Sequence, residues 1–269
     1  MLEFFMRLPI LRRWIPSIGI RILKLLKKNR GFFKIVDIEF FLDFLDPVDR
    51  QIILYKKYEH DQIIFFEDQI KKNPFSYFLD IGANSGYYSF YFAKKFKNLK
   101  IKSFEPNKDA FNKLEKTLLK NSFNNIEIFN IGLSDNEQVV KMKSQIKHGA
   151  AHTNSSKIDI LDKIDYQNFK IFEATFKVGD NFLNLNNQRI LIKIDVEGHE
   201  LNTLKGLTKN LNQNDCLVQI EIGNNKFNDV DNFLRKNNFK QIFKSKYRLD
   251  YFYINFNNSI ELKWKYFQQ

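Results

Sequence analysis

The chain has 269 residues with 43 Lys and Arg against 31 Asp and Glu, a formal net charge of +12, and 43% of its residues are hydrophobic. These values are typical of a folded globular protein and exclude the collagen-like, disordered and disulfide-rich classes. Because Cys216 is the only cysteine, no intramolecular disulfide, CxxC redox pair or cysteine-rich zinc site can form. We therefore expect a protein of a reducing compartment, the cytoplasm.

Residues 1–34 form a basic N-terminal arm, with nine Lys and Arg residues against Glu3 alone. Apolar residues recur at alternating spacings of four and three, which predicts an amphipathic helical extension broken by two prolines and a glycine. The uncharged run at 14–20 is too short for a membrane span or a signal-peptide core. We expect either an arm packed on the protein or, through residues 1–30, peripheral contact with an anionic membrane surface.

Residues 35–269 are predicted to form a single domain, with a lead-in at 35–74, a core at 75–240 and a closing hairpin at 241–269. In the core, short apolar runs alternate with amphipathic segments, which is the order of elements in a parallel α/β sheet. We predict a doubly wound, mostly parallel, seven-stranded Rossmann-like sheet whose strand carboxyl ends share one ligand-binding rim. The expected strands lie at 77–81, 101–105, 126–131, 190–195 and 217–222, the helices at about 60–71, 86–96, 107–121, 199–211 and 228–237, and the hairpin at 241–256.

Residues 141–157 are polar and follow no hydrophobic period, so we expect a loop over that rim. His148 and His152 within it have the spacing of helical metal ligands, but Gly149 argues against a stable helix. We therefore expect these histidines to contact the acceptor or solvent rather than a metal.

A buried strand at 77–81 runs directly into a glycine-containing turn and then a helix, which is the context of a nucleotide-type site. Gly82 permits a positive φ or close approach of a ligand, and Gly86 lets the helix start against the strand. The dinucleotide fingerprint GxGxxG fails twice, because Asn84 and Tyr87 stand where its second and third glycines belong. The turn therefore argues against a dehydrogenase.

Asp80 lies two residues before the first glycine, where we expect its carboxylate to face the ligand cleft. A negative charge there would repel a pyrophosphate and attract an ammonium group. This preference points to a cationic cofactor, S-adenosylmethionine. The alternative role for Asp80 is capping of the following helix.

Glu105 ends the second strand, 19 residues beyond Gly86. An acidic side chain at this place accepts hydrogen bonds from both ribose hydroxyls, since a carboxylate has two acceptor oxygens. We predict that Glu105 binds the ribose, with a solvated strand-end charge as the alternative.

With these residues the chain resembles a class I S-adenosylmethionine-dependent methyltransferase and, more narrowly, the FkbM family. Four segments carry the likeness: DIGAN at 80–84, FEPN at 104–107, GLSD at 132–135 and IKIDVEGHE at 192–200; the lead-in motifs at 45–47 and 58–59 are also similar. The resemblance implies O-methylation, typically of sugar hydroxyls in glycans, glycolipids or related metabolites. The cofactor-binding residues that we predict from the turn, the ribose position and the resemblance are Asp80, Gly82, Ala83, Asn84, Gly86, Tyr87, Glu105, Pro106, Ser134, Asp135 and Asp195.

The end of the strand at 190–195 offers three candidate bases for an acceptor hydroxyl, Asp195, Glu197 and His199, which we rank in that order. Asp195 could equally position cofactor or acceptor, whereas Glu197 and His199 could instead cap the next helix. The family often has a small residue at the place of His199. Asp195 and Glu221 are too few to predict a Mg²⁺ site, so we predict no metal.

Two other functions compete with sugar methylation. The charge of +12 and the many aromatic residues suggest a nucleic-acid methyltransferase, but the core carries little excess charge and no nucleic-acid-reading motif, so we expect no nucleic-acid partner. A non-catalytic, cofactor-binding, membrane-associated partner of glycan enzymes is the third possibility. The sequence leaves the oligomeric state open.

Overall fold

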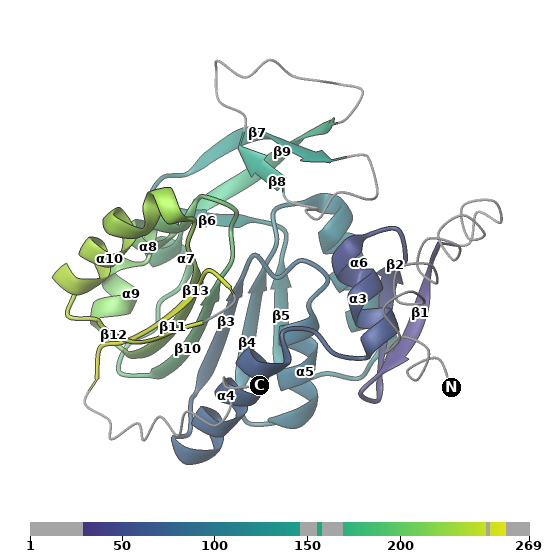
Figure 1. The fold of residues 1–269 in the computed structure, drawn as a ribbon, viewed down its shortest axis with the longest axis horizontal. Coiled ribbons are helices and arrows are strands. Elements are labelled where there is room, and N and C mark those ends of the chain that lie inside the picture. The colour runs from purple at the N-terminus through teal and green to yellow at the C-terminus, as the bar shows by residue number, and fades with distance from the viewer. Residues whose placement is uncertain (1–28, 146–154, 158–168, 246–247, 257–269) are drawn as a thin grey trace.

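The computed structural model describes residues 29–145, 155–157, 169–245 and 248–256. Its main sheet has seven strands, and the predicted fold is confirmed (Figure 1). These strands are β3 (Tyr77–Ile81), β4 (Lys100–Phe104), β5 (Ile126–Phe129), β10 (Arg189–Ile194), β11 (Asp215–Glu221), β12 (Lys240–Lys244) and β13 (Asp250–Ile254). They lie in the order β12-β13-β11-β10-β3-β4-β5, in which β13 alone runs antiparallel to its neighbours.

Helices cover both faces of this sheet, because side chains alternate between faces along each buried strand. Phe78 packs in one apolar cluster with residues of α4 and α5, whereas Leu79 packs in the other with residues of α8, α9 and α10. The helix predicted at 199–211 is divided into two by Leu207, which has a φ of −109° and caps both halves. The helices are α3 (Pro47–Tyr55), α4 (His60–Lys72), α5 (Tyr87–Lys95), α6 (Lys108–Lys120), α7 (Gly179–Phe182), α8 (Glu200–Gly206), α9 (Thr208–Asn212), the 3-10 turn η1 (Asn224–Lys226) and α10 (Phe227–Lys236).

The lead-in opens with an antiparallel hairpin of β1 (Arg30–Ile35) and β2 (Ile38–Asp43). Residues 30–34, which we assigned to the helical arm, therefore lie in a strand, along which exposed positions alternate with half-buried ones, as in a hairpin with one face on the protein. The rest of the predicted arm lies outside the described residues. The hairpin docks on α6 through the Phe41 amide, which donates to Thr117 Oγ1 at 2.9 Å.

A second sheet, with the order β6-β9-β7-β8, stands above the rim of the first (Figure 1). Its strands are β6 (Gly132–Ser134), β7 (Gln138–Gln145), β8 (Ser155–Lys157) and β9 (Phe169–Val178). The loop expected at 141–157 is therefore wrong at both ends, since β7 pairs with β9 from Gln138 to Gln145. Met142 is buried between the exposed Lys141 and the half-buried Lys143, an alternation that the polar composition obscured. His148 and His152 lie outside the described residues.

The order of the main sheet reverses between β3 and β10, since the chain first builds β3-β4-β5 to one side and later adds β10 and β11 on the other. In open α/β sheets this switch point leaves a crevice at the strand carboxyl ends.

Among the described residues, no helix is long and apolar enough to cross a membrane.

Candidate active site

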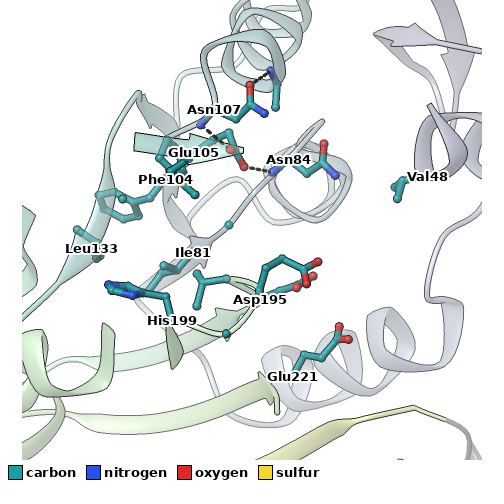
Figure 2. A pocket seen from close by; sticks show the side chains of 18 of the residues that line it. Val48, Ile81, Asn84, Phe104, Glu105, Asn107, Leu133, Asp195, His199 and Glu221 are labelled. Carbon is teal, nitrogen blue, oxygen red and sulfur yellow. Dashed lines mark hydrogen bonds between the residues drawn. The ribbon is translucent and has the colours of Figure 1, made fainter. Parts of the chain in front are cut away.

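A cavity of about 650 Å³ opens at this switch point, a size within the range of small-molecule sites. It is bounded by the ends of β3, β4, β10 and β11, by residues of α3 and by the second sheet. Seven of the predicted site residues line it: Gly82, Asn84, Glu105, Pro106, Asp195, Glu197 and His199. Figure 2 shows Glu105 and Asn84 on one side of the space and Asp195 with Glu221 on the other.

The turn after β3 brings the ends of three strands together at the cavity. The amides of Gly82 and Ala83 donate to the carbonyl of Phe104 at 2.9 and 3.0 Å, and the Asp195 amide donates to the carbonyl of Ile81 at 3.0 Å. Gly82 has a φ of 82°, and a β-carbon there would lie 1.8 Å from the carbonyl oxygen of Asp195. Only glycine allows this approach, and the positive φ expected of Gly82 is present, whereas close approach of a ligand to it stays a prediction.

Glu105 lies on the side of the cavity formed by the ends of β3 and β4. One carboxylate oxygen accepts the Asn84 amide and the other accepts the Asn107 amide, each at 2.8 Å (Figure 2). A carboxylate has about four lone-pair sites, so acceptor capacity remains on both oxygens for the two hydroxyls of a ribose. Burial raises the pKa of Glu105 to about 7, and the two amide hydrogen bonds oppose that rise. The residues present fit a nucleoside cofactor.

Asp80 does not face the cavity, which corrects the expected orientation. Its side chain lies on the same face of β3 as Phe78, under α5, and the residue is 1% exposed. Ser89 Oγ donates to one carboxylate oxygen at 2.5 Å, while the other oxygen has no hydrogen-bond partner among the described residues. Lys193 stands opposite Asp80 in β10 and opposes the burial that raises the pKa of Asp80. A role for Asp80 at the cofactor ammonium stays a prediction.

Five other predicted cofactor residues support the walls of the cavity instead of lining it. Gly86 is packed against Leu114 of α6, and Tyr87 stacks on Phe40 with ring centroids 5.8 Å apart. Ser134 is buried, and Asp135 accepts two hydrogen bonds from Asn202 at 3.1 Å. Contact of these four residues and of Ala83 with the cofactor stays a prediction.

The three predicted bases differ in their hydrogen-bond partners and in their exposure to solvent. Asp195 Oδ2 accepts from the buried ammonium of Lys193 at 3.0 Å. His199 Nε2 shares a hydrogen bond of 2.9 Å with Ser134 Oγ, and its ring stands edge-on to that of Phe176. Glu197 is exposed at the cavity mouth, and desolvation followed by the charge of Asp195 raises the pKa of Glu197 to about 7.

Glu221 ends β11 directly beside β10 and lines the cavity. Its carboxylate and that of Asp195 point toward the same open side (Figure 2). Burial, followed by the charges of Asp195 and Asp250, raises the pKa of Glu221 to about 8. In the part of the chain that the structure describes, no group of three or more His, Cys, Asp or Glu side chains could hold a metal ion.

The cavity residues that were absent from the predicted site include Tyr58, Glu59 and Arg248. Glu59 is buried at the start of α4, where it accepts from the Tyr88 hydroxyl at 2.8 Å and pairs with Arg248. The sequence signal for Tyr58 and Glu59 was the lead-in motif of the resemblance. No local signal marks Arg248, which meets Glu59 from 189 residues away.

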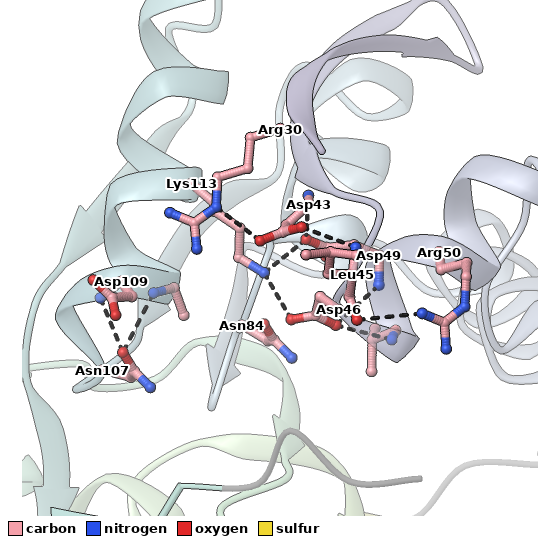
Figure 3. A network of polar contacts seen from close by, with 12 residues as sticks. Arg30, Asp43, Leu45, Asp46, Asp49, Arg50, Asn84, Asn107, Asp109 and Lys113 are labelled. Atoms are coloured by element: carbon pink, nitrogen blue, oxygen red, sulfur yellow. Dashed lines mark hydrogen bonds and ion pairs between the residues drawn. The ribbon is translucent and has the colours of Figure 1, made fainter. Parts of the chain in front are cut away.

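A second charged cluster, the lead-in network, lies beside the cavity (Figure 3). It comprises Arg30, Asp43, Asp46, Asp49 and Lys113. The buried ammonium of Lys113 pairs with Asp49 at 2.7 Å and with Asp46 at 3.1 Å, which joins α3 to α6. Asp43 accepts from Arg30 at 2.7 Å and from the Leu45 amide at 2.8 Å. Because Pro47 and Val48 of α3 line the cavity, this network holds one of its walls.

Comparison with solved structures finds similar chains of low identity. One is an FkbM methyltransferase from Methylobacillus flagellatus, with 14% identity and a TM-score of 0.49 over 66% of this chain and 43% of that chain. Another is an rRNA methylase from Streptococcus thermophilus, with 11% identity and a TM-score of 0.42 over 71% and 92%. A third is a putative methyltransferase from Streptococcus mutans in complex with SAH, with 11% identity and a TM-score of 0.43 over 71% and 95%.

The chain thus spans less than half of the length of the M. flagellatus structure. A search of curated proteins found no match. Residues 80–241, which are more than half of the chain, match the family described as the methyltransferase FkbM domain. The protein therefore belongs to the FkbM methyltransferase family, and S-adenosylmethionine, the predicted cofactor, is confirmed.

Proposed function

We propose that the protein transfers the methyl group of S-adenosylmethionine to a hydroxyl of a sugar in a glycan, glycolipid or related metabolite. One observation carries this proposal: the cavity has two separate carboxylate regions, Glu105 on one side and Asp195, Glu197 and Glu221 on the other. The first suits the ribose of the cofactor, and the second suits an acceptor that presents hydroxyl groups. The FkbM family match supports the same reaction class.

On the cofactor side, Glu105 would accept the ribose hydroxyls, and the Gly82 turn would pass close to the amino-acid portion. Phe104 and Leu133 line the cavity on the Glu105 side and offer apolar contact to the adenine. The bound cofactor supplies a methyl group on a positively charged sulfur. The nearby carboxylates of Asp195 and Glu221 favour that charge.

On the acceptor side, the protein has to hold a hydroxyl oxygen in line with the methyl carbon and sulfur and to remove its proton. Carboxylates accept hydrogen bonds from sugar hydroxyls, and the guanidinium of Arg248 and the ring of Tyr58 extend the polar wall. Lys193 fixes the Asp195 carboxylate, so Asp195 is placed to orient an acceptor hydroxyl.

The test is a transfer assay with cofactor labelled in the methyl group. Purified full-length protein is incubated with methyl glycosides, nucleotide sugars, lipopolysaccharide and RNA in separate reactions, with Glu105→Ala as the site control. We expect label in a sugar fraction that survives mild alkali, as an ether does and a methyl ester does not. Label confined to RNA or to alkali-labile products would reject the proposal.

A further inference from the structure

We propose that Glu221 takes the proton of the acceptor hydroxyl and that it becomes able to do so only when the positive charge of the cofactor enters the cavity. This proposal rests on the proposed methylation of a hydroxyl. It assigns a catalytic role to a residue that the sequence did not rank among the bases.

The other acids and the histidine of the cavity are already engaged by the protein. Asp195 accepts from Lys193, Glu59 from Tyr88 and Arg248, and Glu105 from two backbone amides. His199 shares its Nε2 with Ser134. Glu197 is exposed to solvent at the cavity mouth, where water competes with the acceptor hydroxyl for hydrogen bonds to its carboxylate. By contrast, no group in the described parts of the chain donates a hydrogen bond to the half-buried carboxylate of Glu221.

The position of Glu221 follows from the strand register. Asp80, Lys193 and Gln219 stand side by side on β3, β10 and β11, forming a buried polar row under α4 and α5. Glu221 lies two residues beyond Gln219 and therefore on the same face, at the rim where the row opens into the cavity. The register thus places its carboxylate beside the Asp195 carboxylate, where the acceptor side begins.

The charges around Glu221 are mostly negative. Asp250 of β13 stands opposite Glu221 and accepts from Gln219 at 2.9 Å and from Gln62 at 3.2 Å. The positive charges nearby, on Lys193 and Arg248, are paired with Asp195 and Glu59. Burial and these neighbours raise the pKa of Glu221 to about 8, so most of it is protonated at neutral pH in the free protein. The charged groups facing it are Asp195 and Lys193 from β10, Asp250 from β13, Glu59 from the start of α4, Glu197 from the loop after β10, and Arg248 and Lys226 from the cavity wall.

A protonated carboxyl group cannot act as a base, but a sulfonium charge nearby would lower its pKa and release the proton to solvent. In the reaction, the acceptor oxygen then forms its bond to the methyl carbon as the carbon–sulfur bond breaks and its electron pair stays on sulfur. The hydroxyl proton passes to Glu221. Because the sulfur product is neutral, the pKa of Glu221 returns to its high value and the carboxyl group retains the proton until the products leave.

The experiment measures proton release on cofactor binding and needs no acceptor. Titration calorimetry of the full chain at pH 7.5, in buffers of different ionisation enthalpy, counts protons released by S-adenosylmethionine and by S-adenosylhomocysteine. The sulfonium also lowers the pKa of the ammonium group within its own ligand, so the protons of the ligand are cancelled by comparing wild type with Glu221→Gln for the same ligand. With the pKa of Glu221 at about 8, we expect release of up to about three quarters of a proton for the sulfonium ligand and near zero for the neutral one.

Glu221→Gln should remove most of this release, Glu221→Asp should retain part of it, and Glu197→Gln and the remote Glu127→Gln should leave most of it. Equal release by wild type and Glu221→Gln, or no release by wild type, would overturn the proposal.

In the labelled assay, Glu221→Gln should lower turnover about 100-fold or more. Undiminished sugar methylation by that variant would reject Glu221 as the base and leave the proposed function standing. Glu221-dependent proton release without methylation of any sugar would support the charge coupling and reject the sugar acceptor.

Discussion

The lead-in network and the cavity acids use the same residue types but pair them differently. In the lead-in network, the buried Asp49 has the ammonium of Lys113 at 2.7 Å, and Asp43 has Arg30 at 2.7 Å. In the cavity, Lys193 pairs with Asp195 alone at 3.0 Å, and Glu221 has no donor in the described parts of the chain. Acids that bridge two segments are paired and hold structure, whereas an acid left open at a cavity is available to a ligand.

This difference has an energetic cause. A buried carboxylate without a partner is costly, so it is tolerated only where its proton or a ligand relieves the charge. Glu221 is half-buried, and burial with the neighbouring carboxylates raises its pKa to about 8, which favours the protonated form in the free protein. The lead-in network instead uses Lys113, whose own pKa is raised by Asp49 and Asp46 against the opposing effect of burial. The following substitutions test whether the two regions are separable.

Removing the cation of the lead-in network should have the largest effect. Lys113→Met leaves Asp49 buried without its partner, and we expect a loss of about 3–5 kcal/mol in the free energy of unfolding. Urea denaturation followed by circular dichroism measures it. The double variant Lys113→Met/Asp49→Asn should recover part of the loss, and a loss below about 1 kcal/mol would show that the network is not structural.

Glu105→Ala should mainly weaken cofactor binding. The loss of charge-assisted hydrogen bonds to the ribose should reduce affinity for S-adenosylmethionine about 10- to 100-fold. Calorimetric titration checks this, with Glu105→Gln as the matched variant that keeps one acceptor oxygen. Because Glu105 also accepts the Asn84 and Asn107 amides, a thermal melt must show that both variants are folded at the titration temperature. Unchanged affinity would remove Glu105 from the ribose site.

The stability of the cofactor-free protein should fall as pH rises through the range of the cavity acids. Burial raises the pKa of Glu105 to about 7 and that of Glu221 to about 8, and desolvation with the charge of Asp195 raises that of Glu197 to about 7. The folded state therefore binds more protons than the unfolded chain. The stability contributed by these groups is fully present below the unfolded pKa of about 4.5 and is lost as pH rises to the folded values, by about 1–2 kcal/mol between about pH 5 and 8 after solvent screening. Urea unfolding at several pH values tests the sign. Glu221→Gln should flatten the upper part of the curve, and a rise in stability with pH would contradict these pKa values.

An exposed ion pair outside both regions should have the smallest effect. Glu127 pairs with Lys102 at 2.6 Å on neighbouring strands, but 61% of its side chain is exposed. Glu127→Gln should change the free energy of unfolding by less than about 0.5 kcal/mol and leave cofactor affinity unaltered. A larger change would mean that surface charge, and not burial, governs the contrast between the two regions.

Local sequence patterns were sufficient to predict much of the side of the cavity that contains Glu105. The strand at Tyr77–Ile81 agrees with its prediction at both ends, because a compact apolar run followed by glycine leaves little choice of element. Glu105 was found from its distance along the chain to Gly86. The second sheet was missed because β7 and β9 contain many polar side chains. Their alternation identifies them as strands only once the two segments are known to pair. The segment at 199–211 was predicted as one helix because its periodicity continues across Leu207, where the structure divides it into two.

The sequence by itself determined the α/β class, the glycine turn at Gly82, the place of Glu105 at the strand end that faces the cavity and the family, because each depends on neighbours within a few residues or on a fixed spacing. Only the tertiary structure decided that Asp80 turns away from the cavity and that Glu59 meets Arg248. It also decided which acid keeps an open carboxylate. These properties depend on strand register and on charges from distant segments, and no local pattern encodes the distance between such groups.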